Sequence, residues 1–357
     1  MKIVQIVPTL IFGDAVGNDV RALKKIISEK GYKTQIYAEN IDSRLSKETA
    51  LSISKFPRLS KEDVIIFHES IATDLNQWIQ TQPCRKVMIY HNITPPEFFK
   101  PYSRESFAAC ARGYDEVGKL TESFDMILSD SAYNRQNLTD MGFRCPNHVL
   151  PILIPFDDYK KEPSRKILNE YGAPGWTNII FVGRVVPNKC HEDVIAAFHE
   201  YQKYFNPKSR LFLVGSLMGT YANRLKEYAA RLGTQNVVFT GHCPFEEILA
   251  YYHLADIFLC QSEHEGFCVP LVEAMFFDVP IVAYDSSAIG ETLGGGGFLL
   301  KEKEPFLTAG AMHRVLSDGA LRQTIVQNQR ERLADFEYEK VKALFWKYMD
   351  EFLGAGE

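Results

Sequence analysis

Residues 257–275 read Ile-Phe-Leu-Cys-Gln-Ser-Glu-His-Glu-Gly-Phe-Cys-Val-Pro-Leu-Val-Glu-Ala-Met. The apolar run Ile257 to Cys260 predicts a buried strand, and the segment from Pro270 onward predicts a helix. The polar segment between them then lies at the carboxyl end of a strand, where open α/β sheets bind their ligands. A strand, a polar loop and a helix in this order predict an α/β fold.

The amino end of this predicted helix is suited to bind an anion. With Pro270 in the first helical position, the amides of Leu271 and Val272 have no partner within the helix, and the helix dipole favours a negative charge there. Two carboxylates, Glu265 and Glu273, accompany these donors, and carboxylates accept hydrogen bonds from vicinal hydroxyls. The stretch therefore suits a ligand with both a phosphate and a sugar ring. An acidic loop followed by an ordinary dipole-stabilising glutamate is an equally good alternative for this stretch alone.

A second segment contributes two cations. Residues 178–182 predict a strand, Arg184 follows it, and Lys189 comes one turn later, just before a helix that starts at His191 or Glu192. Two cations and a helix amino terminus in one crevice would hold a diphosphate. Taken alone, an arginine and a lysine are more often solvated. Their combination with the two glutamates favours the diphosphate interpretation.

The whole chain alternates short β-rich runs with helical patterns, which is typical of a doubly wound parallel sheet. The alternation stops at a polar segment, residues 157–162, which is flanked by prolines and suits an interdomain linker. It then starts again, so we expect two α/β halves. The expected strands are 2–8, 33–38, 64–67, 87–90, 126–129, 147–154, 178–182, 210–214, 237–240, 257–260 and 281–284, and the expected helices are 16–30, 132–141, 192–204, 223–232, 245–254, 270–277 and 340–352.

Length and composition agree with two soluble cores. The chain has 357 residues, a net charge of −5 and 46% hydrophobic residues, which argues against a nucleic-acid partner held by bulk charge. Its seven cysteines show no CxxC spacing and indicate reduced thiols rather than a disulfide framework or a zinc finger. No run approaches the roughly 18 apolar residues of a membrane span. Gln5 and Pro8 interrupt the apolar start, which argues against a secretory signal.

The same residues carry a family pattern. Glu265 and Glu273 resemble the E-x7-E signature of retaining glycosyltransferases of family 4, and Arg184 with Lys189 is similar to that family's diphosphate-binding pair. The resemblance runs in order through most of residues 178–300 and includes 239–242, 255–258 and 288–292. The first half matches more loosely, through a glycine-rich first loop, the strand end at His91, and Ser129-Asp130-Ser131. Cys190 and Cys268 depart from the pattern, because glycine is frequent at both positions.

The resemblance implies the GT-B fold, in which two Rossmann-like doubly wound domains face a central cleft. Residues 1–156 would form the acceptor-binding domain and residues 157–339 the domain that binds the nucleotide-sugar donor. A carboxy-terminal helix, residues 340–357, would cross back to the first domain. Considered without the resemblance, the apolar face of this helix suits packing against a neighbouring domain, and weak peripheral association with a membrane is the alternative.

The resemblance also implies roles for individual residues. Arg184 and Lys189 would grip the donor diphosphate, Glu273 the ribose hydroxyls and Glu265 the transferred sugar, while His91 would lie beside the reacting carbon. Asp14 and His68 are expected to bind the acceptor. The remaining expected donor contacts are Gly13, Gly17, His242, Cys243, Gly266, Phe267, Cys268, Leu271 and Val272.

The implied reaction is transfer of a hexose, with retention, from a nucleotide diphosphate sugar to a hydroxyl acceptor. UDP-glucose or a similar UDP-hexose is the expected donor, and the acceptor is a saccharide, a lipid-linked molecule or another hydroxyl compound. No metal is expected, because two cations and a helix end would stabilise the leaving phosphate. Such enzymes commonly build bacterial polysaccharides, which implies a cytoplasmic location that includes the inner face of the membrane.

Two other functions are compatible with parts of the chain. Glu39 ends the second strand, where an NAD-dependent oxidoreductase has its ribose-binding acid, but Gly13 and Gly17 lack the G-x-G-x-x-G spacing. A non-catalytic two-domain sugar-binding protein would share the cleft but usually carries a secretory signal.

Overall fold

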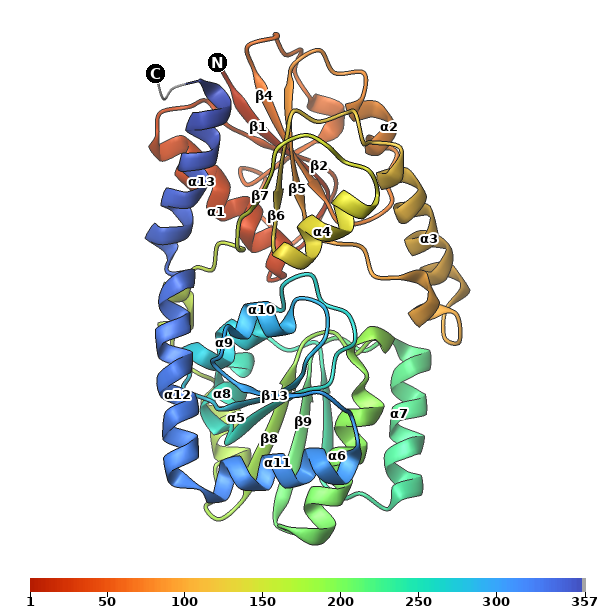
Figure 1. The fold of residues 1–357 in the computed structure, drawn as a ribbon, viewed down its shortest axis with the longest axis vertical. Helices are drawn as coiled ribbons and strands as arrows, with labels where there is room; N and C mark the ends of the chain where they lie inside the picture. Colours follow the sequence, from red (N-terminus) through yellow and green to blue (C-terminus); the bar gives the residue numbers. More distant parts are fainter. Residues whose placement is uncertain (355–357) are drawn as a thin grey trace. The chain divides into compact units, whose positions relative to one another are not determined.

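The computed structural model describes residues 1–354, which form two α/β units (Figure 1). Unit 1 comprises Met1–Glu97, Glu105–Phe156 and the described part of Phe336–Glu357, and unit 2 comprises Phe98–Arg104 and Asp157–Asp335. The expected first domain ran without a break to residue 156, whereas the structure groups Phe98–Arg104 with unit 2. Residues 355–357, the end of the expected last helix, lie outside the described residues.

Unit 1 is built on a parallel sheet of seven strands in the order β3-β2-β1-β4-β5-β6-β7. The chain leaves β1 in one direction and returns to the other side of it at β4, so the topological switch point lies between these two strands. The expected strand 147–154 ends after three residues. The strands are β1 (Ile3–Leu10), β2 (Ile36–Ile41), β3 (Leu51–Ser52), β4 (Val64–Glu69), β5 (Arg85–Tyr90), β6 (Met126–Ser129) and β7 (Asn147–Val149).

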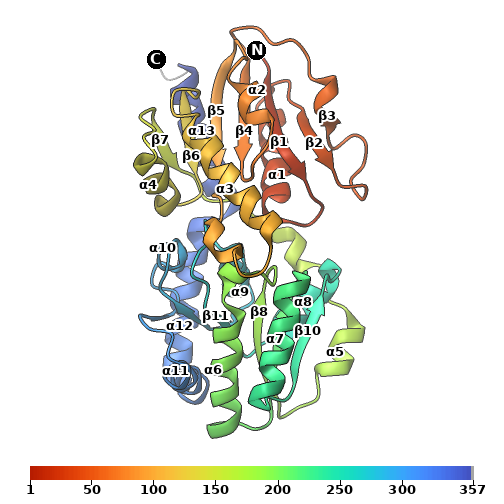
Figure 2. The same cartoon turned by 90° about the vertical axis from the view of Figure 1, so that its right-hand side faces the viewer.

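Helices cover both faces of this sheet. On one face α1 (Ala15–Glu29) and α13 (Tyr338–Leu353) bury apolar side chains against β1, β4, β5 and β6. On the other face lie α2 (Leu75–Ile79), α3 (Arg104–Gly118) and α4 (Ala132–Asp140). In Figure 1 α1 and α13 lie to the left of the strands and α2 and α3 to the right, and Figure 2 shows α3 in front of this sheet.

The last helix belongs to the core of unit 1. Val341, Phe345 and Met349 follow one another at four-residue spacing and are buried, as expected for one face of a helix. Trp346 stacks on Tyr32 with ring centroids 5.8 Å apart. The apolar face of α13 is therefore occupied by packing. None of the helices formed by residues 1–354 combines the length and the apolar character that crossing a bilayer requires.

Unit 2 has a parallel sheet of six strands in the order β10-β9-β8-β11-β12-β13. Its switch point lies between β8 and β11, because the chain first adds β9 and β10 on one side of β8 and then continues with β11 on the other. The strands are β8 (Thr177–Val182), β9 (Ser209–Val214), β10 (Val237–Gly241), β11 (Ile257–Cys260), β12 (Ile281–Tyr284) and β13 (Phe298–Leu300).

Eight helices accompany this sheet within the described part of unit 2. Helix α6 packs against α7 and α11, α5 against α8, and α9 against α12. The helices are α5 (Arg165–Tyr171), α6 (His191–Tyr204), α7 (Gly219–Leu232), α8 (Phe245–Leu254), α9 (Val269–Phe276), α10 (Ile289–Leu293), α11 (Pro305–Ser317) and α12 (Gly319–Leu333), and the single turns of 3-10 helix in the two units are η1 (Ile53–Lys55), η2 (Pro96–Phe99), η3 (Phe156–Lys160), η4 (Pro187–Lys189) and η5 (Ala334–Phe336). Two doubly wound α/β units are the fold class expected from the sequence.

Candidate functional site

The expected donor-binding side chains of unit 2 gather at its switch point. Strands β8 and β11 are hydrogen-bonded neighbours, with Ile179 opposite Ile257. Arg184 follows β8 by two residues, and residues 261–268, here called the acidic loop, follow β11. Because both strands run in the same direction, both segments emerge at the same edge of the sheet, which is the usual ligand-binding edge of such a fold.

The turn η4 is bonded directly to the acidic loop. The side-chain amide of Asn188 donates to the carbonyl of His264 (2.9 Å), and the carbonyl of Asn188 accepts from the amide of Glu263 (2.9 Å). These bonds bring the Lys189 ammonium into contact with Oε2 of Glu265. The Lys189 side chain is 17% exposed and that of Glu265 is 7% exposed. A half-buried cation therefore sits on a buried carboxylate at the switch point.

Three hydroxyl groups from the segment after β12 form hydrogen bonds with the backbone of the acidic loop. Ser287 Oγ accepts from the amide of Glu265 (2.9 Å), and Ser286 Oγ donates to the carbonyl of Ser262 (2.6 Å). Thr292 donates its hydroxyl to the carbonyl of Phe267 (2.5 Å). Ser286 and Ser287 were not predicted from the sequence, whereas Thr292 lies in the stretch 288–292 that resembles the family pattern.

Arg184 is exposed at the end of β8. Within residues 1–354 its guanidinium makes no hydrogen bond or ion pair with another side chain, so its donors are open to a ligand. Gly183, the residue before Arg184, lies in close contact with Gly215 at the end of the neighbouring strand β9. Gly183 and Gly215 have φ values of +145° and +144°, and a Cβ on Gly215 would lie 2.0 Å from the carbonyl oxygen of Gly183. Only glycine fits at position 215.

Glu273 is fixed by two tyrosines that the sequence reasoning missed. The hydroxyl of Tyr159 donates to Oε1 (2.7 Å), and the hydroxyl of Tyr252 donates to Oε2 (2.6 Å). Burial raises the pKa of Glu273, and the two phenol hydrogen bonds oppose that rise. A carboxylate offers about four acceptor positions. Each oxygen of Glu273 therefore keeps capacity for a further donor such as a sugar hydroxyl.

Helix α9 begins one residue earlier than expected, at Val269. The amide of Leu271 donates to the carbonyl of Cys268 (3.0 Å), which corrects the expectation that this amide has no partner and can bind a phosphate. Cys268 itself lies in the left-handed region at φ +73°, and Cys190, which precedes α6, does so at φ +49°. These are conformations that glycine adopts most readily.

The other expected donor contacts of unit 2 border the same edge. His242 is exposed just after β10, and Cys243 is buried, with its thiol 3.5 Å from the carbonyl of Gly241. Phe267 is buried and Gly266 is half-buried. Their contacts with a donor stay predictions, as do those of Cys268 and Val272.

In unit 1 the expected site residues form a buried chain of side chains. His68 Nε2 lies 2.9 Å from Gln5 Oε1, His68 Nδ1 lies 3.0 Å from His91 Nε2, and His91 Nδ1 lies 2.9 Å from Asp130 Oδ2. Because the Gln5 oxygen only accepts, His68 donates from Nε2 and accepts at Nδ1. His91 must then donate from Nε2, so a single proton is shared between His91 Nδ1 and Asp130.

Within this network the neighbouring carboxylates favour a protonated His91, paired with Asp130. Burial lowers the pKa of His68. Burial alone would lower that of His91 as well, but Asp130, helped by Asp19 and Asp14, raises it above its usual value. His68 is fully buried with both ring nitrogens bonded, which corrects the expectation that it binds the acceptor directly. The His91 ring is 2% exposed and also has both nitrogens bonded, so it offers no open nitrogen to a ligand.

Asp19 is a further buried acid beside this chain. Its Oδ1 accepts from the amide of Leu153 (2.8 Å). Burial raises the pKa of Asp19 to about 7, with Asp130 adding to the rise and His91 opposing it. The carboxyl ends of β4, β5 and β6 thus enclose a titratable polar network that the sequence reasoning assigned only in part.

The glycine-rich first loop is shaped by its own packing. Asp14 caps α1, where its Oδ1 accepts from the amide of Gly17 (2.6 Å). A Cβ at Gly17 would lie 2.3 Å from the carbonyl oxygen of Ile11, and Gly13 has φ +82°. Both glycines are therefore required by the turn itself. Contacts of Gly13, Gly17 and Asp14 with a ligand stay predictions.

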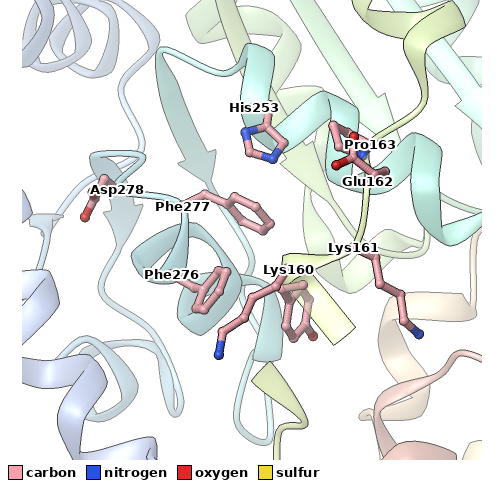
Figure 3. Close-up of a pocket in the computed structure, with 9 residues that line it drawn as sticks. Lys160, Lys161, Glu162, Pro163, His253, Phe276, Phe277 and Asp278 are labelled. Carbon is pink, nitrogen blue, oxygen red and sulfur yellow. The ribbon is translucent and has the colours of Figure 1, made fainter. Parts of the chain in front are cut away.

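A cavity of about 520 Å³ lies at the far end of α9 (Figure 3). Figure 3 shows the Phe277 ring on the side of His253 and Lys161 extending away from the rings. None of the four charged side chains of the switch point, which are Arg184, Lys189, Glu265 and Glu273, lines the cavity. Tyr159, which lines it, is hydrogen-bonded to Glu273. The lining residues are Tyr159, Lys160, Lys161, Glu162, Pro163, His253, Phe276, Phe277 and Asp278.

The chain is similar in sequence to known proteins. Residues 165–332, which contain all four charged side chains of the switch point, match the family model described as Glycosyl transferases group 1. The capsular polysaccharide biosynthesis glycosyltransferase CapM of Staphylococcus aureus is 24% identical over 269 residues, which are 72% of this chain and 68% of CapM. A GDP-mannose-dependent alpha-(1-6)-phosphatidylinositol monomannoside mannosyltransferase of Mycolicibacterium smegmatis is 28% identical over 189 residues, 50% of this chain and 49% of its own length.

The fold is also similar to solved structures. HepE of Anabaena, determined in complex with UDP and glucose, has a TM-score of 0.77 and 18% identity, and the alignment covers 98% of this chain and 100% of HepE.

Proposed function

The chain is a glycosyltransferase of group 1 with the GT-B fold, and on this premise we propose that it transfers a hexose, with retention, from a nucleotide diphosphate sugar to a hydroxyl acceptor. UDP-glucose or a similar UDP-hexose is the proposed donor. The observation that carries the proposal is the contact of Lys189 with Glu265 at the sheet edge where the exposed Arg184 follows β8. This arrangement offers positive charge to a diphosphate and an acceptor oxygen to a sugar at one edge of the sheet.

Lys189 and Arg184 suit the leaving diphosphate. When the bond to the sugar breaks, negative charge grows on the β-phosphate, and a donor aimed at such charge is worth about 2 to 4 kcal/mol. Lys189 is already held in position by Glu265, so little reorganisation is needed when the phosphate binds. The proposed reaction needs no metal, because these two cations supply the charge.

Glu265 suits the transferred sugar. Its Oε2 contacts Lys189, whereas Oε1 is buried and has no hydrogen-bond partner among the described residues. A buried acceptor without a partner is costly, and a sugar hydroxyl would satisfy it. Glu273, held by its two tyrosines, is the proposed partner of the ribose hydroxyls.

Retention is proposed to follow from attack on the face that the diphosphate leaves. In that path the acceptor passes its proton to a phosphate oxygen, so no separate nucleophile or base of the protein is required. His91 would act as an imidazolium that Asp130 holds in place at the carboxyl edge of unit 1.

The proposed acceptor is a saccharide, a lipid-linked molecule or another hydroxyl compound used in bacterial polysaccharide synthesis. The name of CapM supports this pathway. A cytoplasmic location that includes the inner face of the membrane would place the enzyme beside both substrates.

Incubation of the purified chain with UDP-glucose, GDP-mannose and ADP-glucose tests the proposal. We expect the true donor to stabilise the chain by about 2.7 kcal/mol at 100 times its dissociation constant. We also expect release of the nucleoside diphosphate, and a product whose anomeric configuration, read by NMR, equals that of the donor. Release from GDP-mannose alone would replace the proposed donor, and an inverted product would refute retention.

A further inference from the structure

Within residues 1–354, three groups of side chains bring at least three potential metal ligands within 4.8 Å of one another. Two of these groups are already satisfied. In the group of Asp19, His68 and His91, the histidine nitrogens are all engaged in the chain from Gln5 to Asp130. In the group of Cys190, Asp193 and Glu263, the ammonium of Lys303 contacts both carboxylates and takes the place of a cation.

The third group comprises the last residue of β11 and two residues of the acidic loop. Cys260 ends β11, Cys268 precedes α9, and Glu265 lies between them in the loop. The ligand atoms of the three residues lie within 4.8 Å of one another, and all three residues are at most 7% exposed. The thiol of Cys260 donates to Ser262 Oγ (3.4 Å), a bond that would be given up when a metal binds. Oε1 of Glu265 is buried without a hydrogen-bond partner. We propose that Cys260, Cys268 and Glu265 form a binding site for one thiophilic divalent cation, of the class of Zn²⁺ and Cd²⁺.

The donor set favours this class of ion. Sulfur ligands select zinc-like and softer metals, whereas Mg²⁺ and Ca²⁺ prefer oxygen. Tetrahedral coordination with Zn–S bonds of about 2.3 Å places two sulfurs about 3.8 Å apart. Since the ligand atoms already lie within 4.8 Å of one another, side-chain movements of about 1 Å complete three positions. The fourth position is left for water or for a substrate hydroxyl.

The charges also balance. Binding converts two thiols into thiolates and releases two protons, and Glu265 adds a third negative charge. The dication and the Lys189 ammonium neutralise all three. Lys189 contacts Oε2, so Oε1 can bind the metal without loss of the ion pair. A neutral cluster is the form in which a buried site is least penalised.

The backbone conformation at position 268 does not require a cysteine, because glycine would fit it better. Its φ of +73° is one that glycine adopts without strain. The cysteine therefore places a thiol beside Cys260 in a conformation that disfavours any side chain. Binding of a cation would offset the free-energy cost of this backbone conformation. It would also occupy Oε1 of Glu265, the oxygen that we assign to the transferred sugar. The resulting inhibition of transfer rests on the proposed function, whereas the binding itself does not.

The binding test uses the reduced, chelator-treated full chain and Cd²⁺, whose thiolate complexes absorb in the near ultraviolet. We expect the absorption band to saturate at one ion per chain, with release of about two protons per ion. Cys268→Gly, which relieves the strained backbone, and Cys260→Ser should each lower the affinity at least about tenfold. Cys145→Ser is the matched control, because Cys145 is a half-buried thiol of unit 1 outside the three groups, and it should bind as the unchanged chain does.

The proposal is overturned if the band is absent, if it survives in both Cys260→Ser and Cys268→Gly, or if Cys190→Ser removes it instead. Turnover is measured separately. Zn²⁺ should inhibit donor consumption by the unchanged chain and should do so at least about tenfold more weakly in Cys260→Ser, each relative to its own metal-free rate. A chain that binds Cd²⁺ but consumes no nucleotide sugar would refute the proposed function and leave the metal site standing.

Discussion

Lys189 and Glu265 form an ion pair at the switch point of unit 2, and only one oxygen of the carboxylate takes part in it. The pair joins the segment after β8 to the segment after β11. It therefore links the residue proposed to bind the diphosphate to the residue proposed to bind the sugar. Donor binding can use the lysine and the second carboxylate oxygen together.

Replacement of Lys189 tests its role in the leaving step. Lys189→Ala should lower turnover by about two orders of magnitude or more, because one donor aimed at developing charge is lost. Initial rates of nucleoside diphosphate release measure this. Lys208→Ala is the control, since Lys208 is an exposed lysine that precedes β9 at the opposite edge of the sheet. Turnover of Lys189→Ala within threefold of the unchanged chain would refute the role.

Removal of a tyrosine hydroxyl tests how Glu273 is held. Tyr252→Phe should raise the donor KM by about tenfold, because a hydrogen bond to a charged acceptor is worth about 1.5 to 3 kcal/mol. It should also move the acidic limb of kcat/KM to higher pH, since the phenol opposes the rise that burial causes in the pKa of Glu273.

Tyr159→Phe should act in the same direction, and Tyr204→Phe, at a residue 56% exposed, should change neither quantity. A loss of activity without any change of the pH profile would mean that the tyrosine is merely structural.

Gly215 should tolerate no side chain. Gly215→Ala places a Cβ against the carbonyl of Gly183 and forces alanine to a φ of +144°. We expect a loss of about 3 kcal/mol or more in the free energy of unfolding of unit 2, measured by chemical denaturation. Gly219→Ala is the matched control, because a Cβ there meets no atom within 4 Å. Equal stability of the two variants would contradict the close approach of the two loops.

Asp19 should make the stability of unit 1 depend on pH. Its pKa is about 7 in the fold and about 3.9 in an unfolded chain, so between these values the folded state holds a proton that the unfolded state has lost. The free energy of unfolding contributed by Asp19 is therefore present below pH 4 and falls, by up to about 1.4 kcal/mol per pH unit, as the pH rises to 7.

Asp19→Asn keeps an acceptor for the amide of Leu153 and should remove this part of the dependence. Denaturation curves of both proteins from pH 5 to pH 8 measure it. Parallel curves would show that Asp19 does not carry the raised pKa.

Much of the fold could be predicted from local pattern. The strands 126–129, 257–260 and 281–284 and the helix 245–254 have the bounds that the sequence indicates, because each is an apolar run or face enclosed by polar residues. The sequence-based prediction lacked the strands β3 and β13 and the helices α2, α5, α10, α11 and α12. Strand β3 is too short to show a period, and α12 is so polar that it has almost no apolar face.

Candidate site residues could be predicted only where they follow a recognisable strand or precede a recognisable helix in the sequence. That Arg184, Lys189, Glu265 and Glu273 gather at one edge of the sheet follows from the order of two strands, and their contacts with a donor stay predictions. Tyr159 lies 114 residues from Glu273, and no local pattern signals such a bond. His68 was misassigned because the last residues of a strand alternate between faces, and its partners Gln5 and His91 come from neighbouring strands of the same sheet.

A crystal structure of the chain with UDP-glucose would show the proposed donor site itself. We expect the diphosphate within hydrogen-bonding distance of Lys189 Nζ and the Arg184 guanidinium, with ribose hydroxyls on Glu273. A nucleotide bound elsewhere on unit 2, with Lys189 still paired to Glu265 alone, would contradict it.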